Sequence, residues 1–133
     1  MAQLLIQLYI ALALHGGESM TGVAPRYAPG VMERVIRVRH LAPAGCNVSS
    51  AYYGIGTELW VWSHNTKVVR RCRVADVSNP TKKNGGESDQ ERHQRTGKII
   101  EFSYRDARWG CGLAHLNDRP ERCPVTVIRI EGE

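Results

Sequence analysis

Two adjacent runs of alternating side chains constrain the fold of this chain more than any other feature. The run over residues 57–63 sets two aliphatic side chains against two aromatic ones, namely Leu59 and Val61 against Trp60 and Trp62. A polar turn at 64–67 follows, and residues 68–77 return as a second apolar run that ends on Asp76. Because side chains of a strand alternate between its two faces, this segment predicts a β-hairpin with apolar groups on both faces. Such a hairpin is either buried on both sides or offers one side to a ligand.

The rest of the chain indicates a mainly β domain. Residues 31–38, 98–102 and 124–130 are short runs rich in Val and Ile, and each is predicted to be a strand, although 31–38 also fits a helical spacing. Residues 104–109 are expected to form one short helix, capped by Ser103 with Asp106 in the capping-box position. The polar segment 78–95 lacks apolar periodicity and predicts a long exposed loop. Several strands with one short helix favour a small barrel.

The four cysteines form no Cys-x-x-Cys pair, which favours disulfides over a zinc site. Three pairings are open. We favour Cys111 with Cys123, because the segment between them is polar and rich in turn residues, and this leaves Cys46 with Cys72. Disulfides imply an oxidising compartment. The alternative is four reduced, buried cysteines in a cytosolic protein.

The start of the chain predicts export. Residues 4–14 are almost wholly apolar and are followed by His-Gly-Gly at 15–17, the layout of a signal peptide core, and the run is too short to span a bilayer. No Lys or Arg precedes Arg26, so the usual charged first region is missing. We therefore expect residues 1–17 to be a signal peptide or an N-terminal apolar helix, residues 18–30 to be a linker, and residues 31–133 to be the barrel domain.

Charge restricts the partners without selecting one. The chain of 133 residues carries 18 basic and 13 acidic residues and a net charge of +5. A positive protein favours polyanionic surroundings such as nucleic acid, anionic wall polymers or lipid headgroups. No phosphate-binding, dinucleotide-binding or metal-ligand spacing occurs, so no nucleotide, cofactor or metal is predicted.

Five short segments stand in a fixed order over residues 45–130. They are 50–54 (Ser-Ala-Tyr-Tyr-Gly), 56–61 (Gly-Thr-Glu-Leu-Trp-Val), 74–76 (Val-Ala-Asp), 97–103 (Gly-Lys-Ile-Ile-Glu-Phe-Ser, followed by Ala107) and 123–127 (Cys-Pro-Val-Thr-Val). In this order they resemble the double-psi β-barrels of the rare-lipoprotein-A and barwin/expansin group. The resemblance implies a small six-stranded double-psi β-barrel, secreted or held at the cell envelope, that acts on cell-wall polysaccharide.

The resemblance also implies a site. Asp76 and Glu101 stand at the positions of the acidic residues of the family, and each lies at or within a strand of apolar neighbours, where desolvation suits a proton-donating carboxyl group. They are the candidate catalytic residues for cleaving a glycosidic bond. The wall-cleaving members carry a His shortly before the Gly-Thr strand, whereas residues 52–55 contain none. His93, in the predicted loop, is the candidate substitute.

Four aromatic residues are candidates for stacking on sugar rings: Tyr52, Tyr53, Trp60 and Trp62. Some of them must fill the core. The structural alternatives are that Asp76 accepts backbone N–H bonds from the loop, that Glu101 pairs with an arginine, and that His93 is solvated.

Three functions follow, in order of preference. The first is a secreted, monomeric domain that binds peptidoglycan or a related polysaccharide, with lytic transglycosylase activity as an added function. The second is a noncatalytic barwin-like module that binds carbohydrate or a protein partner. The third is a basic barrel that binds nucleic acid, which free thiols and a steep salt dependence would favour.

Overall fold

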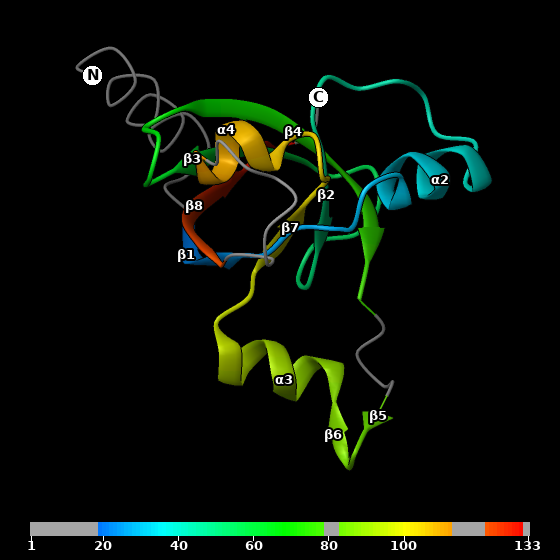
Figure 1. Cartoon of the computed structure of the whole chain (residues 1–133), viewed down its shortest axis with the longest axis vertical. Coiled ribbons are helices and arrows are strands. Elements are labelled where there is room, and N and C mark those ends of the chain that lie inside the picture. Colours follow the sequence, from blue (N-terminus) through cyan, green and yellow to red (C-terminus); the bar gives the residue numbers. More distant parts are fainter. Residues whose placement is uncertain (1–18, 79–82, 113–121, 132–133) are drawn as a thin grey trace.

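A computed structural model describes residues 19–78, 83–112 and 122–131. Within them the chain forms, in order, β1 (Ser19–Ala24), α2 (Val31–Val38), β2 (Asn47–Ser50), β3 (Glu58–Ser63), β4 (Val69–Val77), β5 (Lys83–Asn84), β6 (Glu87–Ser88), α3 (Asp89–Thr96), β7 (Ile100–Phe102), α4 (Ala107–Cys111) and β8 (Cys123–Arg129). Six of these strands make one sheet in the order β1-β8-β3-β4-β2-β7, and β5 and β6 form a separate hairpin. The protein is therefore mainly β, with short helices outside the sheet (Figure 1).

The sheet curls into a nearly closed barrel. Most neighbouring strands are antiparallel, but β2 runs parallel to β4. The two outer strands of the sheet, β1 and β7, also approach each other. The N–H of Val23 donates to the carbonyl of Gly97 at 2.9 Å, and the N–H of Ile99 donates to the carbonyl of Val23 at 3.0 Å. A second parallel contact joins Arg26 to Phe102. These bonds form a seam between residues 23–27 and 97–102, so the edge strands are largely paired.

The interior of the barrel is apolar. Val48, Leu59, Val61, Val74, Phe102, Val125 and Val127 have no exposed surface. In β3 the buried positions alternate with half-buried ones, as the sequence predicts, with Leu59 and Val61 inside and Trp60 and Trp62 outside. Trp60 and Trp62 pack instead against Ile128 on the outer surface. The predicted hairpin of β3 and β4 and the closing strand β8 are confirmed.

Two disulfides tie the ends of these strands together. Cys46, which precedes β2, is bonded to Cys72 of β4, and Cys111 at the end of α4 is bonded to Cys123 at the start of β8. Both pairs are as predicted. Loops of 26 and 12 residues are closed, and each closure is worth about 3 kcal/mol in the chain-entropy account. Disulfides of this kind indicate an extracellular domain.

The strand predicted over 31–38 is wrong, because these residues form helix α2. The segment fits both periods, and Gly30 at the helix N-cap adopts a left-handed conformation (φ 80°) that glycine allows. Met32 is the one residue of this helix that is fully buried, while Val31 and Val38 are exposed. The helix lies outside the barrel (Figure 1).

The linker expected over 18–30 also differs from the structure. Residues 19–24 form strand β1, which pairs with β8 in antiparallel register from Ser19 with Ile128 to Ala24 with Cys123. Gly22 lies in this strand where a larger side chain would not fit, so it does not mark a flexible connector. The predicted apolar helix or signal peptide at 1–17 lies outside the described residues. No helix in the described ranges is both long and apolar enough to cross a bilayer.

The long loop predicted over 78–95 is wrong for its described part, which holds β5, β6 and α3. Helix α3 begins with a capping box: the Ser88 hydroxyl accepts from the Glu91 N–H at 3.1 Å, and the Glu91 carboxylate accepts from the Ser88 N–H at 3.4 Å. Local capping and not an apolar face specifies this helix. The helix predicted at 104–109 is present as α4, but it begins at Ala107 with Asp106 as its N-cap in place of Ser103, and it is ended by Gly112 at φ 72°. Three short helices therefore replace the single one expected.

The seam predicts a sharp steric effect at Gly22. A Cβ atom there would lie 2.5 Å from the Gly97 carbonyl oxygen and 2.8 Å from Cγ2 of Ile99. Gly22→Ala should therefore separate β1 from β7 and lower the free energy of unfolding by about 1–3 kcal/mol, the usual cost of overpacking. Urea unfolding measures this. Gly54→Ala is the control, since nothing lies within 4 Å of its Cβ position; equal effects of the two changes would contradict the proposed role of the seam.

Candidate functional site

Strand β2 brings the two predicted acids together. Ser49 pairs with Asp76 of β4 on one side and with Glu101 of β7 on the other. Residues paired across neighbouring strands project from the same face of a sheet, so the two carboxylates flank Ser49 on one face. A bulge between Val48 and Ser49 sets this register. Both carboxylate side chains are largely buried, with exposed fractions of 19% and 18%.

Tyr27 completes this cluster. Its hydroxyl donates to Oδ2 of Asp76 at 2.7 Å, and its backbone N–H donates to the Phe102 carbonyl beside Glu101 at 2.8 Å. Burial raises the pKa of the Tyr27 phenol far above its ordinary value; a hydrogen bond with Ser49 lowers it, and the bond to Asp76 and the negative charges of Asp76 and Glu101 raise it. The phenol therefore stays protonated and acts as a donor. Sequence reasoning missed Tyr27, which lies in a Pro-Arg-Tyr-Ala-Pro stretch without periodicity.

Each acid has its own cation. Nη2 of Arg39, which caps the C-terminus of α2, lies 2.6 Å from Oδ1 of Asp76, and Nζ of Lys98 lies 2.6 Å from Oε1 of Glu101. The arginine partner proposed for Glu101 is thus a lysine, three residues away in the sequence.

Asp76 lies at the edge of an open cleft. The cleft has a volume of about 480 Å³ and is lined by Val31, Arg34, Val35, Val38, Arg39 and Asp76. Helix α2 therefore supplies most of the cleft wall. The exposed Val31 and Val38 make part of that wall apolar.

The aromatic residues separate into two groups. Tyr52, 42% exposed, and the half-buried Tyr53 follow β2, and the backbone N–H groups of both donate to the Ser50 hydroxyl. They lie within four residues of Ser49. Trp60 is instead paired with Arg71, five residues before Asp76 on β4, or about 16 Å along the strand. The tryptophans are therefore not beside the acids, whereas Tyr52 and Tyr53 follow the strand that carries Ser49.

The tryptophans belong to a separate outer surface. The centroids of the Trp62 and His64 rings lie 4.8 Å apart with the rings tilted by 44°, and Nζ of Lys67 lies 5.5 Å from the Trp62 centroid. The His64 ring in turn contacts Oγ1 of Thr126 at 2.7 Å. These contacts tie the tryptophans to β8 and not to the acidic cluster.

His93 is a helical residue and not the solvated loop histidine of the structural alternative. It lies in α3 and is 2% exposed, with its Nε2 atom 3.4 Å from the Ser78 hydroxyl. Burial lowers the pKa of the imidazole, and the positive charges of Lys98 and Arg92 lower it further, against a smaller opposing effect of Asp89. A neutral, enclosed imidazole fits a structural role. Among the described residues no group of three or more His, Cys, Asp or Glu side chains could hold a metal ion.

The chain is structurally similar to a bacterial expansin. The crystal structure of the apo expansin of Clavibacter michiganensis is 18% identical, with a TM-score of 0.49, and the match covers 87% of this chain and 52% of that one. A mutant of the same expansin in complex with cellohexaose gives 18% identity and a TM-score of 0.49, over 86% and 51%. The chain thus spans about half the length of these expansins. No protein-family model and no curated protein matches it.

The lowered pKa of His93 predicts acid destabilisation. In the unfolded chain the imidazole binds a proton near its ordinary pKa of 6.5, whereas in the folded state it stays neutral to lower pH. The contribution of neutral His93 to the free energy of unfolding is therefore complete above pH 6.5 and is lost as the pH falls through the folded pKa. Urea unfolding between pH 7.5 and 5 should show this slope in the wild type and a flatter one in His93→Gln. The exposed His40→Asn should retain the wild-type slope.

The raised pKa of Tyr27 predicts the opposite dependence at alkaline pH. The unfolded phenol loses its proton near pH 10.0, whereas the folded one keeps it. The stabilisation is complete below that pH and is lost as the pH rises through the folded pKa. Tyr27→Phe should therefore be less stable than the wild type at pH 8.5, and the difference should narrow by pH 11 in urea unfolding. The exposed Tyr52→Phe is the control; a constant gap for Tyr27→Phe would contradict the assignment.

Proposed function

We propose that this chain is an extracellular, wall-associated domain that binds peptidoglycan or a related polysaccharide. The observation that carries the proposal is the cluster in which Asp76 and Glu101 flank Ser49 beneath the hydroxyl of Tyr27. Carboxylates and hydroxyls in one place supply the acceptors and donors that sugar hydroxyls require, and bonds to charged acceptors are the stronger ones. The exposed Tyr52, three residues after Ser49, offers an aromatic face for a sugar ring.

Binding without cleavage fits this site better than lytic transglycosylation. A general acid must carry a proton when it meets the glycosidic oxygen. Asp76 and Glu101 each have a cation 2.6 Å from one carboxylate oxygen, and the other oxygen of Asp76 accepts the Tyr27 hydroxyl. Charged, fixed acceptors are well suited to hydrogen-bonding a glycan. Cleavage is therefore an outcome for the assay to detect and not the function we favour.

We also propose the double-psi connectivity for the barrel. Two parallel contacts support it, namely β2 with β4 and the seam of β1 with β7, in a sheet that is otherwise antiparallel. The order of the segments over residues 50–127 supports it independently.

The proposal predicts selective loss of wall binding. Purified peptidoglycan should retain the wild type in a sedimentation assay, and Asp76→Asn and Glu101→Gln should each bind about tenfold more weakly, as expected for losing a hydrogen bond to a charged group. Glu58→Gln is the matched control, since Glu58 is also an ion-paired strand residue, 2.6 Å from Arg71. It changes the net charge equally but should leave binding unchanged. Cellohexaose, the ligand of the expansin complex, is a soluble neutral probe.

Three results would overturn parts of this proposal. Equal losses in Glu58→Gln and the two site variants would reduce the interaction to general charge. Absence of binding to every glycan tested would contradict the proposed function. Soluble muropeptides released by the wild type and not by Asp76→Asn would identify a lytic enzyme in place of a binding module.

A further inference from the structure

A second cavity lies at the other end of β4. It has a volume of about 450 Å³ and is lined by Ala44, Gly45, Arg70, Arg105, Asp106, Arg108 and Trp109. Arg70 precedes Asp76 by six residues, or about 20 Å along the strand. This arginine pocket is therefore distinct from the acidic cluster.

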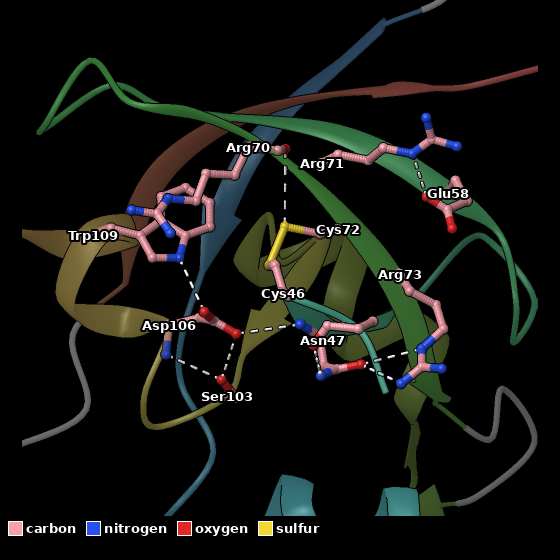
Figure 2. The surroundings of a disulfide bond; sticks show 12 residues. Cys46, Asn47, Glu58, Arg70, Arg71, Cys72, Arg73, Ser103, Asp106 and Trp109 are labelled. Carbon is pink, nitrogen blue, oxygen red and sulfur yellow. Dashed lines mark hydrogen bonds and ion pairs between the residues drawn. A yellow bond between two sulfur atoms is a disulfide. The ribbon is translucent and has the colours of Figure 1, made fainter. Parts of the chain in front are cut away.

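Two of its three guanidinium groups are held in place. The Arg70 guanidinium lies over the Trp109 ring, 5.3 Å from its centroid, as Figure 2 shows. Nη2 of Arg105 donates to the Gly45 carbonyl at 2.9 Å. An arginine fixed by stacking or by a backbone bond keeps other N–H donors for a ligand and loses less conformational freedom on binding.

The acidic residue of the pocket does not use up this positive charge. Asp106 is 3% exposed, and its oxygens accept from the Asn47 N–H at 3.2 Å, the Ser103 hydroxyl at 2.8 Å and Nε1 of Trp109 at 3.1 Å (Figure 2). Its nearest approach to Arg105 is 4.0 Å. Asp106 thus orients the indole on which Arg70 lies. No carboxylate in the described part of the chain forms an ion pair with Arg70 or Arg108.

Both disulfides stabilise the walls of the arginine pocket. Cys46 adjoins Gly45 and is bonded to Cys72, two residues after Arg70. Cys111, at the end of the helix that carries Arg108 and Trp109, is bonded to Cys123. Arginines that line one cavity can bind carboxylate or phosphate groups with two parallel hydrogen bonds.

We propose that the arginine pocket binds the carboxylate or phosphate groups of an anionic polysaccharide. Three arginines against one internally bonded aspartate leave a local excess of two positive charges, which a single neutral glycan would not require. The two disulfides favour an extracellular polyanion over nucleic acid. This goes beyond the function proposed above, because both the site and the ligand chemistry differ. Simultaneous occupation of the two sites by one wall would add avidity.

Binding of defined polyanions tests the proposal. Polygalacturonate supplies carboxylates on sugar rings, and polyglycerol-phosphate teichoic acid supplies phosphates. In 50 mM salt Arg105→Gln/Arg108→Gln should bind the preferred polymer at least about tenfold more weakly than the wild type. The matched control is Arg37→Gln/Arg129→Gln, which removes the same charge from exposed positions outside both sites. The control should lose about twofold or less. Arg108→Glu, at an exposed side chain that forms no ion pair within the described residues, is a second variant and changes one residue only.

The outcomes are separable from those of the acidic cluster. Asp76→Asn should leave polyanion binding intact, and the arginine variants should leave cellohexaose binding intact, so that failure at one site does not imply failure at the other. Equal losses of affinity in the two double variants would contradict the proposal that the arginine pocket binds a polyanion. Absence of binding to either polymer would contradict it as well. Tighter binding of a single-stranded oligonucleotide, with the same dependence on Arg105 and Arg108, would replace the polysaccharide with nucleic acid.

Discussion

The pairing of β2 with two neighbours is the constraint on which the rest of the structure depends. This strand of four residues is parallel to β4 and antiparallel to β7, and that arrangement alone places Asp76 and Glu101 on either side of Ser49. Its first residue, Asn47, also presents its N–H to Asp106 and its side-chain oxygen to Arg73. Because a slip of one residue would turn every side chain of a strand to the other face, the bulge before Ser49 is part of the site.

The packing at the other end of the barrel also depends on strand β2. Asp106 receives the Asn47 N–H and the Trp109 indole, so the start of β2 and helix α4 are fixed to each other by one buried carboxylate. The Cys46–Cys72 bond fixes β2 to β4 at the same place. A charged group buried among donors is stable only while those donors remain in position. The two candidate sites thus share a support without sharing a residue.

The sequence predicted the parts of this fold whose signal is local. Alternation identified the hairpin of β3 and β4 and strand β8, and the polar segment before Cys123 identified the disulfide pairing. Residues 31–38 satisfied both a strand and a helix period, and β1 was hidden by its glycine, whose role depends on a carbonyl oxygen 75 residues away in the sequence. Tyr27 and Arg39 could not be assigned to the acidic cluster, because the contacts that bring them there are tertiary.

The net charge of +5 has meaning only after the ion pairs are assigned. Five acids in the described residues each neutralise a cation at 2.6–2.9 Å: Asp76 with Arg39, Glu101 with Lys98, Glu58 with Arg71, Asp89 with Arg92, and Glu87 with Arg95. These pairs engage Arg39 and Lys98, the two cations bonded to the acidic cluster. Outside these five pairs, Arg70, Arg105 and Arg108 gather around Trp109 in a pocket that also contains Asp106. Composition alone therefore pointed to a polyanion, but the pairing of charges decides which surface would meet it.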